Sequence, residues 1–165
     1  MFMTQITTLG FLVRFSADGE INEICLGMKK IGFGKGNWNG FGGKVGDKTE
    51  FCNESIEESL VREAREEFSV DLLDFEKVGV IDFENVDNMD NIKNIQTHIF
   101  LVKSWTGDVT ESQEMAPKWF KVCDIPFDEM WADDKYWFPR MLKKEYFNAY
   151  FNFKDNQIVS FGFRS

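Results

Sequence analysis

Residues 43–70, GKVGDKTEFCNESIEESLVREAREEFSV, decide how the chain folds. They begin as a glycine-bearing turn and continue as an acid-rich helix. Ser55 and Glu58 form an S-x-x-E capping box, which predicts a helix over 56–68. Apolar residues recur at every fourth position of that helix and predict a buried face; they are Ile56, Leu60, Ala64 and Phe68.

Three carboxylates share the other side of this helix. Glu63, Glu66 and Glu67 stand at i, i+3 and i+4, within roughly a 100° arc. Like charges at these spacings repel each other by a few tenths of a kcal/mol per pair. A hard divalent cation such as Mg²⁺ would compensate that repulsion. An ordinary solvated, charged helix is the alternative, and the carboxylates taken alone favour it.

The end of the stretch carries a resemblance to a known family. The segment REAREE at 62–67 follows Glu54, which stands eight positions before Arg62, and Gly42-Gly43 lies upstream. This arrangement resembles the signature of the Nudix hydrolases, G-x5-E-x7-R-E-U-x-E-E-x-G-U, in which U is an aliphatic residue. The resemblance implies an α+β Nudix fold, a mixed β-sheet sandwiched between α-helices (an α/β/α sandwich), with one domain over residues 1–165.

The chain departs from this signature at two places. Ten residues rather than five separate Gly43 from Glu54, which indicates a five-residue insertion within 46–53. Ser69 stands where the signature has glycine. Glycine at that position supplies a positive-φ helix stop, so serine either costs on the order of 1 kcal/mol or ends the helix with another geometry.

Composition restricts the class of partner. The chain has 165 residues, 43% of them hydrophobic, which suits one compact domain with a sizeable core. Its net charge of -9 argues against a nucleic-acid polymer as partner, because such binding usually needs a basic surface. A small nucleotide held through a metal ion remains compatible with that charge.

Cysteine usage and the first residues indicate a cytoplasmic protein. Cys25, Cys52 and Cys123 are widely separated and only His98 could join them, so neither a zinc site nor a disulfide framework is expected. His98 itself lies in a strand pattern and is interpreted as structural. Residues 1–15 lack a basic n-region, and Arg14 interrupts their apolar run, so we expect no signal peptide and no membrane partner. Nothing in the sequence demands a dimer, and we expect a monomer.

The remaining elements follow from β-rich runs and turn residues. Strands are predicted at 5–15, 23–29, 75–84 and 96–105, with a polar loop at 85–91. Residues 114–120 lead into another short strand, which Ile125-Pro126 closes. A short helix should end near Lys144, and a terminal hairpin should join 146–154 to 157–163 around Asp155-Asn156. Residues 29–44 contain six glycines among lysines and aromatic residues, which favours a loop that contacts a ligand closely over a flexible surface loop.

Further segments extend the resemblance over nearly the whole chain. Residues 26–30, 32–45, 114–115, 125–127 and 130–139 are similar to those Nudix hydrolases of animals that act on oxidised purine nucleoside triphosphates. The resemblance implies hydrolysis of 8-oxo-dGTP and 2-hydroxy-dATP to the monophosphate and pyrophosphate. Two alternatives stay open: a Nudix hydrolase of another nucleoside diphosphate derivative, and a nucleotide-binding module that has lost catalysis.

The same resemblance implies a metal site and its supporting residues. The proposed ligands of Mg²⁺, with Mn²⁺ as the alternative, are Glu63, Glu66, Glu67, Glu114 and the carbonyl of Gly42. Arg62 is expected to pair with Glu54 and so orient the carboxylates, and Lys44 beside Gly43 is expected to contact a phosphate. Which carboxylate accepts the proton of the attacking water stays open.

The resemblance also implies a pocket for the base and sugar. Asn39, Asp133 and Asp134 would read the edge of the base, and Phe33, Phe83 and Trp131 would form walls, with Lys29 and Thr8 near the sugar. Adjacent acids cannot easily both ionise, so one would hold a proton and act as donor. A helix N-cap is the alternative role for the two aspartates. Asn85 replaces a second wall phenylalanine, which predicts a more polar wall.

Overall fold

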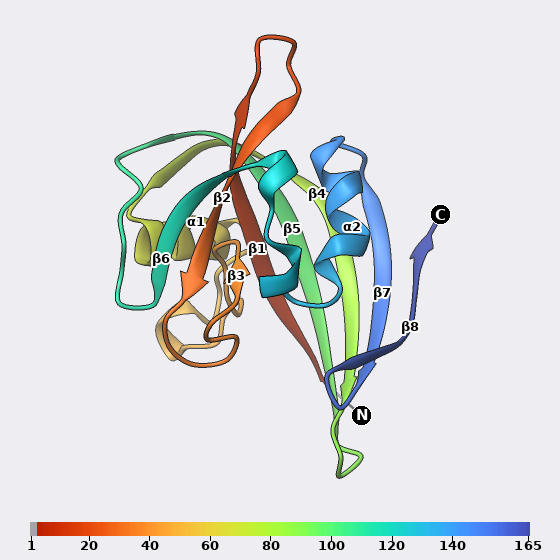
Figure 1. Ribbon diagram of the computed structural model, residues 1–165. Helices are drawn as coiled ribbons and strands as arrows, with labels where there is room; N and C mark the ends of the chain where they lie inside the picture. Colours follow the sequence, from red (N-terminus) through yellow and green to blue (C-terminus); the bar gives the residue numbers. More distant parts are fainter. Residues whose placement is uncertain (1–2) are drawn as a thin grey trace.

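The computed structural model describes residues 3–165, which form one mixed sheet flanked by two α-helices (Figure 1). The strands are β1 (Thr4–Phe15), β2 (Ile21–Lys29), β3 (Trp38–Asn39), β4 (Asp71–Val86), β5 (Ile92–Thr106), β6 (Met115–Lys121), β7 (Phe147–Lys154) and β8 (Gln157–Arg164). The α-helices are α1 (Ile56–Phe68) and α2 (Asp134–Leu142), and short 3₁₀ turns span Thr49–Phe51, Val122–Asp124 and Phe127–Glu129. Within this range neither helix has the length and apolar character needed to cross a membrane.

β1 is an interior strand of a sheet that contains both parallel and antiparallel pairs. The strand order is β3-β2-β1-β5-β4-β7-β8, and β6 also pairs with β2. β1 pairs in parallel with β5 and, at its far end, antiparallel with β2. β4 pairs antiparallel with β5 and in parallel with β7. The mixed sheet expected from the sequence is therefore confirmed.

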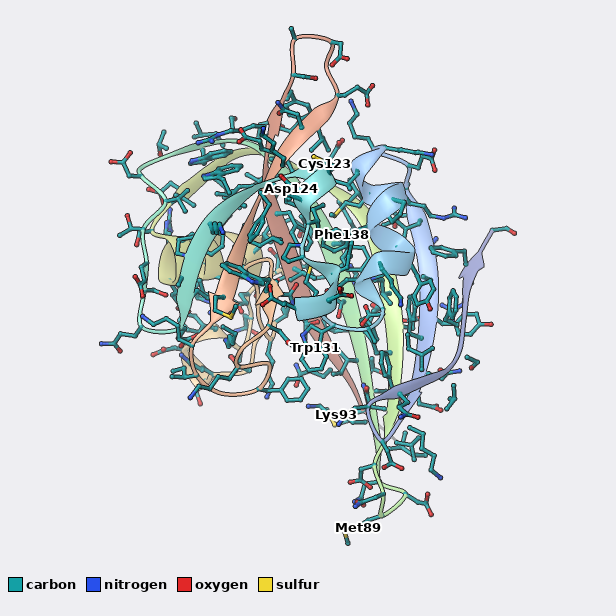
Figure 2. All side chains as sticks on the ribbon, viewed as in Figure 1. Met89, Lys93, Cys123, Asp124, Trp131 and Phe138 are labelled. Atoms are coloured by element: carbon teal, nitrogen blue, oxygen red, sulfur yellow. The ribbon has the colours of Figure 1, made fainter. Side chains whose placement is uncertain are left out.

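The alternation of side chains along the central strands places one helix on each face of the sheet. Phe11 of β1 belongs to the same hydrophobic cluster as Trp137 and Phe138 of α2. Leu12, the next residue, belongs to the other cluster, which contains Leu60 of α1. Successive strand residues point to opposite faces, so the two clusters lie on either side of the sheet. Figure 2 shows Phe138 in the layer between α2 and the strands.

Helix α1 has the predicted bounds and the predicted start. The Ser55 hydroxyl accepts the Glu58 N–H, and the Glu58 carboxylate accepts the Ser55 N–H, which completes the capping box. Leu60, Ala64 and Phe68 are fully buried. The helix ends at Ser69, whose φ of 60° and ψ of 34° are left-handed. Serine thus adopts the geometry that glycine usually supplies, at a cost of about 1 kcal/mol.

Several elements differ in length from the prediction. β4 and β5 extend beyond 75–84 and 96–105 because their backbone ladder continues through polar side chains, as in the Asn85↔Lys93 pair. The predicted loop at 85–91 is correspondingly shorter. Trp38–Asn39, expected within a loop, pairs with β2 as a two-residue strand. The terminal hairpin is confirmed, and Asp155 and Asn156 both have positive φ, as its tight turn requires.

Candidate active site

One large cavity joins the glycine-rich segment, α1 and the start of α2. Its volume is about 1080 Å³, at the upper end of what small-molecule sites occupy. Twelve of the residues singled out in the sequence line it: Thr8, Lys29, Phe33, Asn39, Gly42, Gly43, Lys44, Glu67, Phe83, Trp131, Asp133 and Asp134. Arg62, Glu63, Glu66 and Glu114 are not among its lining residues.

Glycine is required where the loop passes between β1 and α1. The Thr8 N–H donates to the Gly43 carbonyl at 2.9 Å, so the loop runs directly alongside β1. A Cβ at Gly42 would lie 2.0 Å from the Thr8 carbonyl oxygen. A Cβ at Gly43 would lie 2.3 Å from Glu63 Oε1. Only residues without a side chain bring the loop this close to the acidic face of α1.

Glu63 and Glu67 form a buried acidic pair. Their exposed fractions are 9% and 2%. The Gly42 N–H donates to Glu67 Oε1 at 3.3 Å. Burial and then the neighbouring Glu63 charge raise the pKa of Glu67 to about 8, although Lys29 acts in the opposite direction. Burial also raises the pKa of Glu63, against the effect of the Arg62 charge.

This pair has the chemistry that a divalent cation needs. Two carboxylates that are buried side by side are costly to keep ionised unless positive charge compensates them. Their oxygen atoms are the hard ligands that ions such as Mg²⁺ prefer. The residues present therefore fit a divalent metal ion.

The other two predicted acids lie apart from this pair. Glu66 is exposed, and its carboxylate lies 3.4 Å from Arg62 Nη1. The carboxylate of Glu114 lies 3.6 Å from Lys29 Nζ, and its side chain is half exposed. Between residues 3 and 165, no three His, Cys, Asp or Glu side chains are grouped so that they could hold one metal ion. The structure thus brings together two of the four acids that the sequence indicated.

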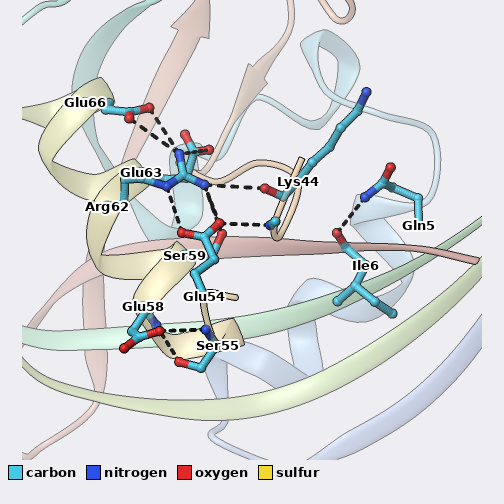
Figure 3. A network of polar contacts seen from close by, with 11 residues as sticks. Gln5, Ile6, Lys44, Glu54, Ser55, Glu58, Ser59, Arg62, Glu63 and Glu66 are labelled. Atoms are coloured by element: carbon cyan, nitrogen blue, oxygen red, sulfur yellow. Dashed lines mark hydrogen bonds and ion pairs between the residues drawn. The ribbon is translucent and has the colours of Figure 1, made fainter. Parts of the chain in front are cut away.

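Arg62 links the acidic pair to the residue that precedes the helix. Its Nε and Nη2 donate to the two oxygens of Glu54 at 2.9 and 2.7 Å, so the expected pair is present (Figure 3). Its Nη1 donates to Glu63 Oε1 at 3.0 Å. The Arg62 hydrogen bonds lower the pKa of Glu54 below its usual value. A bidentate pair of this kind fixes the orientation of the guanidinium group.

Asp133 and Asp134 form a second buried acidic pair, which also lines the cavity. Their exposed fractions are 5% and 2%. Trp137 Nε1 donates to Asp133 Oδ2 at 2.9 Å. Burial raises the pKa of Asp133 to about 6, and burial together with the Asp133 charge raises that of Asp134 well above its ordinary value.

The side chains of these aspartates do not cap the helix, which was the alternative role named from the sequence. Asp133 is the N-cap of α2 but has a helical backbone and makes no side-chain cap hydrogen bond. Asp134 Oδ2 is buried and has no hydrogen-bond partner among residues 3–165. The Thr8 hydroxyl, which also lines the cavity, is unpaired there in the same way. Buried polar atoms normally have partners, so both atoms are available to a ligand.

Aromatic side chains also line the cavity. Phe33 is 82% exposed and stacks on Trp131, with the ring centroids 5.0 Å apart. Phe83 also lines the cavity and packs against Phe151 of β7. Phe33 and Trp131, expected as separate walls, therefore touch each other and form one wall. The positive φ at Gly32 and Gly34 turns the loop so that Phe33 reaches Trp131.

Sequence reasoning missed three residues that bear on this region. Trp137 stands four positions after Asp133, and this i,i+4 spacing on a helix could have revealed it. Lys93 lines the cavity and lies 6.0 Å from the Phe33 ring, and no motif marked it (Figure 2). Phe51 contacts Arg62 from inside the insertion, where the signature offers no guide.

Comparison with known proteins identifies the family. Residues 8–141 match the NUDIX domain family. The chain is 40% identical over 159 residues to the oxidized purine nucleoside triphosphate hydrolase of Danio rerio, and the match covers 96% of this chain and 93% of that protein. It is 44% identical over 143 residues to the protein of the same name from Mus musculus, with 86% of each covered.

A solved structure supports the fold independently. The crystal structure of the MutT protein from Bacillus halodurans matches with a TM-score of 0.79 at 23% identity, over 96% of this chain and 97% of that one. At this level of identity the likeness concerns the fold alone. Together with the match over residues 8–141, it shows that the chain belongs to the Nudix hydrolase family.

Proposed function

We propose that this protein hydrolyses oxidised purine nucleoside triphosphates, 8-oxo-dGTP and 2-hydroxy-dATP, to the monophosphate and pyrophosphate, and so removes them from the nucleotide pool. The observation that carries the proposal is that one cavity is lined both by a buried carboxylate suited to a metal ion, Glu67, and by the buried pair Asp133 and Asp134. The names of the relatives from Danio rerio and Mus musculus support the same substrate class.

The metal end is assigned to the triphosphate. Nudix hydrolases use divalent metal ions, and for this chain we propose Mg²⁺, with Mn²⁺ as the alternative. Its ligands would be Glu63 and Glu67 first, joined by the others named from the sequence: Glu66, Glu114 and the carbonyl of Gly42. When bound, the ion neutralises phosphate charge and lowers the pKa of an attacking water.

The chain's own residues have distinct tasks at this end. Arg62 holds Glu63 and Glu54 in place, which is supported by its contacts of 2.7 to 3.0 Å with both. Lys44 and Gly43, which line the cavity beside Thr8, are assigned to the phosphates. One of the carboxylates accepts a proton from water, and separate substitutions of Glu66, Glu67 and Glu114 by glutamine would identify it.

The buried aspartates are assigned to the edge of the purine. Asp134 is the more perturbed of the two and keeps its proton, so it donates a hydrogen bond, while Asp133 accepts one. Exchange of the proton between them would suit both an oxidised guanine and an oxidised adenine. Asn39 would join them at this edge. Phe33, Phe83 and Trp131 would contact the faces of the base.

The sugar is assigned to the space near Thr8 and Lys29. The buried hydroxyl of Thr8 has no partner among the described residues and can pair with a sugar hydroxyl. Asn85, which lines the cavity on the side of Phe83, would make that wall more polar and shift the range of substrates accepted.

The wider setting follows from charge and size. We infer one Nudix domain over residues 1–165, acting as a monomer in the cytoplasm on a small nucleotide rather than on a nucleic-acid polymer. The net charge of -9 supports the last point, because it repels a polyanion that no local metal ion neutralises.

A nucleotide panel tests the proposal. The purified protein is incubated with Mg²⁺ and 8-oxo-dGTP, 2-hydroxy-dATP, dGTP, dATP or a dinucleoside polyphosphate, and monophosphate and pyrophosphate are measured. We expect the two oxidised nucleotides to be preferred and Glu67→Gln to lower the rate of their hydrolysis by about 10³-fold. Preference for a canonical or dinucleoside substrate would replace the proposed substrate by another. Binding without hydrolysis would identify a nucleotide-binding module.

A further inference from the structure

The inserted loop is an ordered part of the acidic end of the site. It contains a 3₁₀ turn at Thr49–Phe51, and the Phe51 N–H donates to the Lys48 carbonyl at 2.9 Å. The Gly46 N–H donates to Glu54 Oε1 at 3.0 Å, which ties the beginning of the loop to the residue just after it. Glu54 is the residue that holds Arg62. The insertion is thus anchored on the partner of the signature arginine.

The Arg62 guanidinium group lies over the Phe51 ring. The guanidinium carbon lies 4.4 Å from the centre of the Phe51 ring. The edges of the same group donate to Glu54 and Glu63, as Figure 3 shows for the three acids that surround Arg62. An aromatic ring within about 6 Å of a guanidinium group attracts it, and more strongly where water is excluded. The Arg62 side chain is only 14% exposed, so this condition is met.

The Phe51 ring does not serve the hydrophobic core. It belongs to neither of the two buried clusters of the sheet, and its side chain is half-buried at the surface of α1. Its aromatic contacts are with cations: Arg62, and Lys48 at 5.8 Å. A role in packing the core therefore does not explain why an aromatic residue stands at this place.

We propose that Phe51 is a positioning residue of the active site, which holds Arg62 flat so that Arg62 fixes Glu63 for metal binding. Without the ring, one face of the guanidinium group is open, and the group can tilt away from Glu63 Oε1. The insertion thus supplies a support that the Nudix signature itself does not contain. This inference rests on the proposed metal site at Glu63 and Glu67.

Direct metal binding tests the proposal without reference to turnover. Mn²⁺ is titrated into the nucleotide-free protein, and free ion is followed by electron paramagnetic resonance. Substitutions that remove the partners of metal ligands typically cost about 10- to 100-fold in affinity. For the more remote Phe51→Leu we expect a loss of about 5- to 10-fold, with Phe51→Tyr close to wild type because it keeps the ring. Cys52→Ser, an exposed neighbour in the same loop, should change nothing.

A double substitution distinguishes a positioning role of Phe51 from a general structural role. In Arg62→Gln the guanidinium cation is gone, so Phe51→Leu should have no further effect on Mn²⁺ affinity, whereas a structural defect would add to the loss. Circular dichroism melts confirm that each variant is folded, and Phe51→Met replaces Phe51→Leu if the latter is not. Wild-type affinity in the folded leucine or methionine variant would overturn the proposal.

Measurements of turnover then distinguish a failure of this proposal from a failure of the proposed function. With 8-oxo-dGTP and saturating Mg²⁺, we expect Phe51→Leu to lower kcat with little change in KM, since the base end of the cavity is untouched. If wild type hydrolyses no nucleotide, the proposed function fails, while the difference in Mn²⁺ affinity still decides the role of Phe51.

Discussion

Two pairs of buried carboxylates lie in and beside the same cavity, and their surroundings differ. Glu63 and Glu67 on α1 have Arg62 and Lys29 among the groups that shift their pKa values. Asp133 and Asp134 have the Trp137 indole and backbone groups instead, and no cation among the groups that shift theirs. Both pairs are buried to a similar degree. Burial alone therefore does not determine what an acidic pair can bind.

The two pairs differ in what can offset the cost of burying their negative charge. The glutamates lie next to fixed cations, and a divalent ion can complete the neutralisation of their charge when they ionise. The aspartates avoid this cost most simply if one of them keeps its proton, which makes that carboxyl group a hydrogen-bond donor. One pair thus suits the charged end of a nucleotide, and the other suits the neutral edge of its base. Substitutions can therefore perturb each pair separately.

The largest expected effect comes from Glu67→Gln. The substitution removes one of two buried ligands, so we expect kcat for 8-oxo-dGTP to fall by about 10³-fold in Mg²⁺. KM should change little because the base end is intact. Steady-state kinetics with pyrophosphate detection measures both. Glu57→Gln, on the exposed face of the same helix, is the matched control and should retain full activity. A Glu67→Gln enzyme within tenfold of wild type would remove the metal role from this pair.

Substitution of the aspartates should change selectivity rather than chemistry. A site built to bond a polar group rejects a mismatched one strongly, so we expect Asp133→Asn and Asp134→Asn to alter the ratio of kcat/KM for 8-oxo-dGTP and 2-hydroxy-dATP by about 10- to 100-fold. The two variants should do so in different ways, because Asn cannot exchange donor and acceptor roles with its neighbour. Competition assays that include dGTP measure the preference.

Metal binding gives the control for this prediction. Mn²⁺ affinity of Asp133→Asn and Asp134→Asn should equal that of wild type, and Asp128→Asn, an exposed acid before α2, should leave the preference unchanged. If both pocket variants keep the preference among 8-oxo-dGTP, 2-hydroxy-dATP and dGTP, the aspartates do not read the base.

The stability of the metal-free protein should fall as pH rises from about 4 to about 8. The folded pKa values are raised, to about 6 for Asp133 and about 8 for Glu67, so the native state binds more protons than the unfolded state in this range. The free energy of unfolding then decreases with pH, by on the order of 1–3 kcal/mol per group. Urea denaturation at pH 4.5, 6 and 8 measures it.

Substitutions and added Mg²⁺ should show which group causes each part of this pH dependence of the free energy of unfolding. Asp133→Asn should flatten mainly the part below pH 6, and Glu67→Gln mainly the part up to pH 8. Added Mg²⁺ should stabilise the protein at pH 8 through the glutamates and leave the contribution of Asp133 in place. A free energy of unfolding that increases across this range would contradict the raised pKa values.

The sequence was sufficient for α1 because the information is local. Its start is set by a capping box and its buried face by i+4 spacing, both of which depend on residues within one turn. The lengths of β4 and β5 depend instead on a partner strand, so the polar residues at Asn85 and Asn94 hid a ladder that continues through them.

Side-chain pairing in the site was harder to predict for the same reason. The resemblance implies Glu66 and Glu114 as ligands, but in the structure their carboxylates meet Arg62 and Lys29. The contact of Phe51 with Arg62 depends on the path of an insertion that no motif describes. The residue types of the site could be predicted, whereas the pairs that they form with residues distant in sequence could not.

The smallest expected effect concerns the end of α1, outside both pairs. Ser69 is held at a φ of 60°, so Ser69→Gly should stabilise the protein by about 0.5–1 kcal/mol, as relief of the left-handed strain exceeds the entropy that glycine adds to the unfolded chain. Ser69→Ala keeps the Cβ and should give no such gain, and urea denaturation compares the three proteins. Activity should stay constant, because the carboxylate of Glu67 is held by Gly42 and by burial rather than by the helix end. A change in kcat with Ser69→Gly would mean that the cap also positions Glu67, and the glutamate pair would then depend on helix geometry in a way that the aspartate pair does not.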